Sequence, residues 1–261
     1  VMWFLILYNV TYRKENKRDH REHLFSSDKS ARDHRSRAGR KTSASEGNKG
    51  SSDMTIDKDD LLNSIMESLN RVHHIKLEDI PNIDLYMDQV TTFMESKLRS
   101  TVRNPGQDKI LTKTMINNYA KNNLLPPPVK KKYSREHVLM LIFIYYYKGI
   151  LSINDIQTLL KPLSDRYFHA RGEELNLGVI YEEIFGLEKT QLDALKNDIL
   201  NKFETSCQPF KDAPEGEQEF LQLFSFIGLL SFDVYLKKLL IEKMVDELGN
   251  ASREGERQNK K

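Results

Sequence analysis

The chain has 261 residues, with 40 basic and 38 acidic side chains, 39% hydrophobic residues and a mean hydropathy of −0.59. This length suffices for one or two domains with a real core, and the charge-rich composition argues against a membrane protein and a secreted disulfide scaffold. The single cysteine, Cys207, excludes an internal disulfide and any paired-cysteine zinc or redox motif, and it fits a reducing compartment such as the cytoplasm.

The charge is unevenly distributed along the chain. Residues 1–53 carry 12 basic and 7 acidic side chains, and residues 97–135 carry 10 basic side chains against one acidic one. The remainder of the chain is acidic in net charge. A concentrated basic segment indicates a local contact with a polyanion; the alternative is a lysine-rich loop that faces only solvent.

The first 53 residues lack the sequence features of a folded segment. Residues 1–10 form an apolar run that is too short to span a bilayer and lacks the preceding basic residues of a secretory signal. Residues 13–53 have almost no periodic hydrophobicity, which predicts disorder. The segment 1–53 is interpreted as a dispensable tail or translated upstream sequence, and the functional alternative is a basic arm that binds nucleic acid.

From Met54 onward the hydrophobic pattern is helical. Asp57 is placed to cap a helix that extends to about Val72, because apolar residues recur there at i, i+3 and i+4. A second helix is expected to begin with Asp84 as its N-cap and to end near Leu98. The stretch 99–109 contains Asn-Pro-Gly, which predicts a loop.

A short helix and a basic turn are expected next. Thr112 is the predicted N-cap of a helix over residues 113–123, and the three prolines 126–128 end it. The single plausible pair of strands lies within residues 124–133.

Two more helices are expected between residues 134 and 162. Ser134 begins a strongly apolar helix that extends to about Lys148 and that we expect to be buried on most sides. Ser152 begins the other, and Pro162 is expected to follow its end. His137 lies in the first turn of the apolar helix, where we expect it to face solvent or DNA.

The order of these elements predicts a winged helix-turn-helix. A helix N-terminus and lysine side chains neutralise phosphates, and small polar side chains reach base edges in the major groove. Met115, Ile116 and Tyr119 form the apolar side of the short helix and would anchor it. The candidate DNA-binding residues are Thr112, Lys113, Thr114, Asn117, Asn118, Tyr119, Lys121, Lys130, Lys131, Lys132 and Arg135.

The stretch from Leu111 to Leu160 resembles the DNA-binding half of MerR-type regulators, through Leu124-Leu125-Pro126-Pro127 and Lys131-Lys132-Tyr133-Ser134. From about Ile80 to Leu160 it is also similar to an uncharacterised bacterial family, domain-of-unknown-function family 1836. The runs that carry this second similarity are Asp84-Leu85-Tyr86-Met87-Asp88-Gln89-Val90, Leu111-Thr112-Lys113-Thr114-Met115-Ile116-Asn117-Asn118-Tyr119 and Lys131-Lys132-Tyr133-Ser134-Arg135-Glu136-His137. The resemblance implies a cytoplasmic transcription regulator and brings no established ligand.

The sequence departs from the MerR pattern in three ways. Thr114 and Asn117 stand where that family usually carries arginines, the hairpin is shorter without a glycine at its tip, and about a dozen residues separate Leu98 from Thr112. An ordinary helix-turn-helix uses three or four residues at that point. The alternative function is therefore a helical protein-interaction adaptor that does not bind DNA.

Signals for catalysis or metal binding are weak. The chain has no P-loop, no dinucleotide-binding glycine motif, no nucleophile elbow and no zinc-protease motif. The adjacent pair His73-His74 lies about 100° apart on a helix and lacks further ligands. We expect no enzymatic activity, no cofactor and no metal site.

The C-terminal part predicts further helices after a polar connector at residues 166–178. A helix is expected over 188–203, and a long apolar pattern covers 217–248, with a possible break at Gly228. Charged residues within that pattern argue against a membrane span. We expect its spare apolar surface to pack against a second chain in a homodimer; the alternative is burial within its own chain.

These observations predict an all-α protein with a MerR-like winged helix-turn-helix and a helical C-terminal region. The expected divisions are a disordered tail at 1–53, a DNA-binding region at 54–165, a dimerisation or effector region at 166–248 and a disordered tail at 249–261. The expected partners are double-stranded DNA and a second copy of the chain, without a membrane. A third hypothesis is a regulator that senses a small molecule in a pocket between the two helical parts. The sequence does not identify that molecule.

Overall fold

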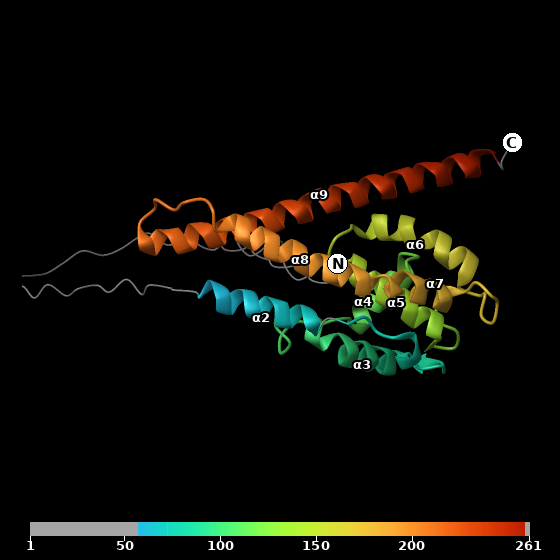
Figure 1. The fold of residues 1–261 in the computed structure, drawn as a ribbon. Helices are drawn as coiled ribbons and strands as arrows, with labels where there is room; N and C mark the ends of the chain where they lie inside the picture. Colours follow the sequence, from blue (N-terminus) through green and yellow to red (C-terminus); the bar gives the residue numbers. More distant parts are fainter. Residues whose placement is uncertain (1–56, 72, 259–261) are drawn as a thin grey trace, which may run out of the picture.

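The computed structural model describes residues 57–71 and 73–258, so the predictions for residues 1–53 lie outside the described residues. The described chain is mostly helical (Figure 1), which confirms the all-α class. Its helices are α2 (Lys58–Asn70), α3 (Met87–Leu98), α4 (Lys113–Lys121), α5 (Arg135–Tyr147), α6 (Ile153–Tyr167), α7 (Leu177–Gly186), α8 (Glu188–Ser206) and α9 (Glu215–Gln258), with short 3-10 turns η1 (Leu77–Asp79) and η2 (Arg99–Thr101).

Three of the predicted N-caps are confirmed. The Asp57 carboxylate accepts hydrogen bonds from the backbone N–H groups of Asp59 and Asp60, at 2.9 and 3.1 Å. The hydroxyls of Thr112 and Ser152 each accept from the backbone N–H three residues later, at 3.1 and 3.2 Å. These short polar side chains satisfy donors that have no partner inside the helix, which explains where α2, α4 and α6 begin.

The predicted cap at Asp84 is wrong. Leu85 and Tyr86 form strand β1 (Leu85–Tyr86), so α3 begins only at Met87. The Gln89 side chain instead accepts a hydrogen bond from the backbone N–H of Tyr86, at 2.8 Å. Strand pairing thus outweighs the local capping preference of Asp84.

The predicted end of α6 at Pro162 is also wrong, because the helix continues to Tyr167 with the proline inside it. A proline in a helix removes one backbone hydrogen bond. Leu163 and Tyr167, beyond the proline, pack against the hydrophobic core, and this packing holds the last turns in place.

A small antiparallel ladder joins two distant parts of the chain. Strand β1 pairs with β2 (Lys132–Tyr133), with Leu85 opposite Tyr133 and Tyr86 opposite Lys132. Within the predicted strand region 124–133, Val129 and Lys132 form a bridge. The sequence therefore located one side of the sheet and missed its partner strand.

Helix α5 lies at the centre of the main core. Ten of its residues, from His137 to Tyr146, are buried, which confirms the prediction of a helix covered on most sides. Side chains from α3, α4, α6 and α7 pack against it in one continuous cluster. The core does not end at the expected division after residue 165, since Leu177 and Tyr181 of α7 belong to the same cluster.

A second, smaller cluster lies between α2, α8 and α9. Its buried members are Leu69, Ile199 and Phe226. Helix α9 extends from this cluster to the main one, where Val245 is buried, and Figure 1 shows it running alongside α8 first and α6 later. The long helix therefore bridges both clusters.

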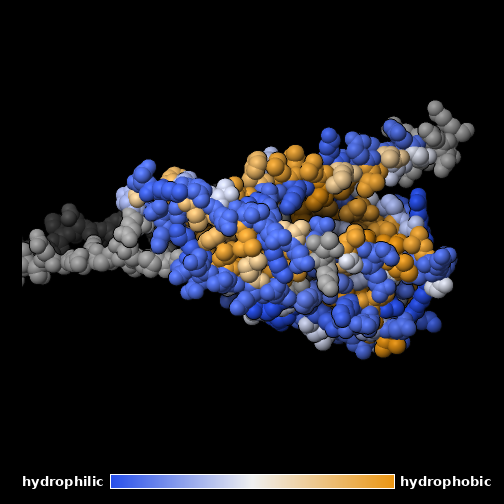
Figure 2. Space-filling view, viewed as in Figure 1, coloured by the Kyte–Doolittle hydropathy of each residue, from blue (hydrophilic) through white to orange (hydrophobic). Residues whose placement is uncertain are grey.

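Helix α9 is unbroken at Gly228 and continues to Gln258, beyond the predicted end of the helical region at 248. Ten of its large apolar side chains, between Phe220 and Leu248, are at least 40% exposed. Figure 2 shows this hydrophobic surface along the helix. The alternative, a helix buried wholly within its own chain, is therefore wrong for the described structure, although Phe226 and Val245 are buried. None of the helices in the described ranges is long and apolar enough to cross a membrane.

Candidate nucleic-acid interface

Helix α4 is fixed at both ends by local hydrogen bonds. Thr112 caps its N-terminus, as described above. At its C-terminus, Asn123 adopts a left-handed conformation with φ of 55°, and the backbone N–H of Leu124 donates to the carbonyl of Tyr119 at 2.9 Å. Asparagine tolerates this conformation, which satisfies the last carbonyls of the helix and turns the chain.

One side of α4 faces the core and the other faces solvent. Ile116 and Tyr119 are buried, as their predicted anchoring role requires. Burial raises the pKa of Tyr119, and its ring supports the helix instead of facing outward. The exposed side carries the candidate contacts Lys113, Thr114, Asn117, Asn118 and Lys121.

A two-residue turn places two lysines at the tip of a small hairpin. Val129 and Lys132 exchange both backbone hydrogen bonds, at 3.1 and 2.9 Å, across Lys130 and Lys131. Both turn residues have positive φ, 50° and 63°, and both side chains are exposed. Tight hairpins need this conformation, and they normally use glycine or asparagine, because a lysine there is strained.

Lys132 and Arg135 are less exposed than Lys130 and Lys131 at the tip of the hairpin. The Lys132 ammonium lies 5.3 Å from the centre of the Tyr86 ring, a cation–π contact across the ladder. The Arg135 guanidinium donates a hydrogen bond to the backbone carbonyl of Leu77, at 2.6 Å. Arg135 therefore anchors η1 to the start of α5, a role that the sequence did not reveal.

The segment of the chain that contains α4 is rich in basic residues. Lys113 pairs with Asp88 of α3, and both side chains remain more than half exposed. Over residues 97–135, Asp108 is the single acidic residue against ten basic ones. Three of these basic residues pair with acidic residues outside the segment, Lys97 with Asp79, Arg99 with Glu95 and Lys113 with Asp88. The remaining positive charge attracts a polyanion at long range, and salt screens the attraction.

The long connection between α3 and α4 is held against the core. Ile110 and Leu111 are buried, and the carbonyl of Ile110 accepts a hydrogen bond from the Lys148 ammonium at 2.8 Å. Thr101 and Tyr145 share a hydrogen bond of 2.5 Å through their hydroxyl groups. The two ends of the connection are thus packed, residues 103–107 between them are exposed, and α3 and α4 remain in contact.

The expectation that His137 faces solvent or DNA is wrong. Its side chain is 3% exposed and lies edge-on to the rings of Tyr133 and Phe168. Its Nδ1 accepts the backbone N–H of Ser134 at 2.9 Å, so His137 completes the N-terminal cap of α5. Burial lowers the pKa of His137, against a smaller opposing effect of the Pro127 carbonyl.

The mutual distances of acidic, histidine and cysteine side chains determine whether they can form a metal centre. Over residues 57–71 and 73–258, no three of them come together in a metal-binding group. His74 is paired with Glu188 instead, at 2.7 Å between Nδ1 and Oε2.

Comparison with protein families gives a match over part of the chain. Residues 75–184 match the model of a family described as Domain of unknown function (DUF1836). The predicted similarity to this family is thereby confirmed, over a range that contains α4 and the hairpin and ends within α7. No curated protein and no solved structure matches the chain significantly.

Proposed function

We propose that this chain is a cytoplasmic DNA-binding regulator of transcription, with a winged helix-turn-helix related to that of MerR-type regulators. Helix α4 lies in the major groove, and the hairpin 129–132 holds phosphates. Thr114, Asn117 and Asn118 reach base edges, while Lys113 and Lys121 neutralise the backbone.

The observation that carries this proposal is the strained pair Lys130 and Lys131. Two adjacent lysines in left-handed conformation cost stability that glycine or asparagine would not cost. Strain of this kind persists where the side chains have a task, and two exposed ammonium groups at a hairpin tip suit a phosphate backbone.

The connectivity of the elements supports the same reading. Strand β1 directly precedes α3, and it pairs with β2, which begins at the last residue of the hairpin. Helix α3 contacts α4, β1 and β2, so one helix positions both the candidate groove-binding helix and the hairpin. The long insertion before α4 packs on the core at its ends and leaves α3 in contact with α4.

The homodimer remains part of the proposal, with α9 as its interface. Every fourth residue from 220 to 248 is an exposed apolar residue or glycine, and we call this row the outer ridge; it consists of Phe220, Phe224, Gly228, Phe232, Leu236, Leu240, Met244 and Leu248. The outer ridge turns by about 40° around the helix at each step, so a crossing copy of α9 would cover a part of it. A two-fold interface must be complementary to itself, and an uncharged apolar row meets that condition. Two copies would present two α4 helices to a pseudo-palindromic site.

Binding to DNA is tested with the full chain and a duplex selected from a random library. Fluorescence anisotropy with excess competitor DNA, at several salt concentrations, should show tight binding that weakens steeply with salt. The variant Lys130→Ala/Lys131→Ala should lower the slope of log K against log salt by about 2, because each lost phosphate contact removes about one unit. Asn117→Ala should instead relax sequence preference, by about 1–3 kcal/mol at one base pair.

The matched control is Lys211→Ala/Lys243→Ala, which removes the same charge from exposed positions outside the segment 97–135. It should leave the salt slope within a few tenths of its original value. Binding that competitor DNA abolishes, or a slope that both double variants change equally, would contradict the proposal. The adaptor function would then be favoured, with the outer ridge as its binding surface.

A further inference from the structure

A cavity lies between the two hydrophobic clusters. It has a volume of about 530 Å³ and is bordered by the C-terminal end of α5, helices α7 and α8, and the middle of α9. Helices α8 and α9 pack on each other where Phe203 meets Phe226, with ring centres 5.4 Å apart, and they diverge toward the start of α8 (Figure 1). The cavity lies between the diverging parts, and its volume is within the range of about 300–1,000 Å³ that small-molecule sites occupy.

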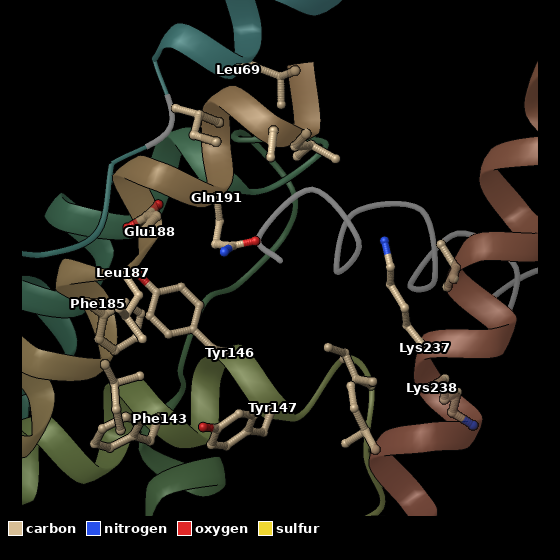
Figure 3. A pocket seen from close by; sticks show the side chains of 18 of the residues that line it. Leu69, Phe143, Tyr146, Tyr147, Phe185, Leu187, Glu188, Gln191, Lys237 and Lys238 are labelled. Carbon is tan, nitrogen blue, oxygen red and sulfur yellow. The ribbon is translucent and has the colours of Figure 1, made fainter. Parts of the chain in front are cut away.

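One wall of the cavity is aromatic. Phe143 and Tyr147 of α5 are stacked with ring centres 6.2 Å apart, and the Phe185 ring of α7 lies 5.9 Å from that of Phe143. Figure 3 shows these rings on one side of the cavity and Lys237 and Lys238 of α9 on the other. Rings in this arrangement favour a flat aromatic body, whose burial also removes apolar surface from water.

The charged side chains at the cavity already have partners. Each charged side chain in the described lining is paired with another side chain, acidic with basic. The pairs are Glu188 with His74, Asp198 with Lys202, Lys237 with Asp233 and Lys238 with Glu242. A charged ligand would have to compete with these contacts or bring an uncompensated charge into an apolar space, which is costly. The lining therefore favours an uncharged ligand.

The face of α9 that borders the cavity is distinct from the outer ridge. The lining residues of α9 are Val234, Lys237, Lys238 and Ile241, and their i, i+3, i+4 and i+7 spacing is that of one helical face. Leu236 of the outer ridge follows Val234 by two residues, which is about 200° around the helix. A second copy on the outer ridge would therefore not occupy the cavity.

We propose that this cavity binds an uncharged small molecule with a flat aromatic body, of the size of a naphthalene with one further ring. The body lies against the rings of Phe143, Tyr147 and Phe185, and α9 covers its other side. The ion pairs around the cavity stay intact in the complex. The site stands apart from α4 and the hairpin, so the proposal does not depend on DNA binding.

The test compares two fluorescent probes that differ by a single charged group. N-phenyl-1-naphthylamine is uncharged, and 8-anilino-1-naphthalenesulfonate has the same ring skeleton with a sulfonate added. Titrated into the full chain, the uncharged probe should show enhanced, blue-shifted emission that saturates at one molecule per chain. The sulfonate should bind about tenfold more weakly or less, because its charge finds no unpaired cation at the cavity.

A variant in the cavity tests the position of the site. Val234 lines the cavity from α9, and Val234→Trp should fill the space and abolish saturable binding of N-phenyl-1-naphthylamine. An intact thermal unfolding transition checks that this variant folds. Leu200→Trp is the matched control, because it adds the same ring at an exposed position of α8 outside the cavity. It should leave the affinity for the probe unchanged.

A second variant separates the cavity from the outer ridge. Leu236→Glu/Leu240→Glu places charge on the ridge, and it should keep binding of the uncharged probe, because neither residue lines the cavity. Loss of binding in this variant would place the probe on the outer ridge and overturn the proposal. Binding that survives Val234→Trp, a sulfonate that binds as tightly as the uncharged probe, or no saturable binding of either probe would overturn it as well.

Discussion

Lys148 is a cationic residue placed in an apolar environment. Its ammonium group donates to the Ile110 carbonyl and lies 4.7 Å from the centre of the Tyr145 ring. Burial lowers the pKa of Lys148 to about 8, because the charged form loses hydration that these two contacts do not replace.

Stability should therefore rise with pH just above neutrality. The pKa of Lys148 is lower in the folded chain than the value of 10.5 expected when unfolded, so between these values the unfolded chain binds more protons and the free energy of unfolding increases with pH. Urea denaturation at pH 7.5 and 9.5 should show a gain of about 2 kcal/mol. Lys148→Met should abolish the gain, and an equal gain in both proteins would exclude Lys148 as its source. Above pH 10 the effect reverses, because burial raises the pKa of Tyr146 and Tyr181.

At the scale of single elements, the hairpin 129–132 has two charged residues at turn positions where other residues would be more stable. Replacing its tip with the preferred turn pair, Lys130→Asn/Lys131→Gly, should raise the free energy of unfolding by about 1 kcal/mol, because both residues favour positive φ. The same variant should weaken DNA binding, since two ammonium groups are lost.

The two effects are measured by urea denaturation and by fluorescence anisotropy on the selected duplex. Lys130→Ala/Lys131→Ala is the control, because it removes the same charge without providing residues that favour this turn. A hairpin variant that is no more stable than this control would show that the turn is unstrained.

Elements whose ends depend on local chemistry were predictable from the sequence. Thr112 and Ser152 cap their helices through hydrogen bonds that span three residues, and the apolar run after Ser134 is long enough to require burial. The same reasoning failed at Asp84, because the pairing of Leu85 with Tyr133 depends on residues far apart in the chain. A strand of two residues also carries no periodic pattern.

The candidate site was only partly predictable for a related reason. The exposed side of α4 follows from helical periodicity, which places Ile116 and Tyr119 inward. The inward positions of Arg135 and His137 depend on what lies beside them, the Leu77 carbonyl for one and two aromatic rings for the other. The left-handed lysines had no sequence signal, since lysine is not a residue that favours such turns.

At the scale of the whole molecule, the outer ridge should decide the oligomeric state. Light scattering after size exclusion should give twice the chain mass of 30.5 kDa. Leu236→Glu/Leu240→Glu should give the single mass, because charge on an apolar interface is costly to bury. It should also weaken DNA binding by about 10²-fold, because two linked binding sites become one.

The control for the dimer is Asn250→Glu, which adds charge at an exposed position off the outer ridge. It should remain dimeric with unchanged DNA affinity. A chain that is monomeric from the start would rule out α9 as a dimer interface and leave its apolar residues for a different partner.

Helix α9 also has a consequence for how the protein unfolds. Its first half contributes Phe226 to the second cluster, its last part contributes Val245 to the main one, and the stretch between them borders the cavity. When either cluster opens, one half of the helix loses its support, and its continuous backbone hydrogen bonds transmit that loss to the other half. We therefore expect the two clusters to unfold as a single cooperative unit, because one helix contributes buried residues to both.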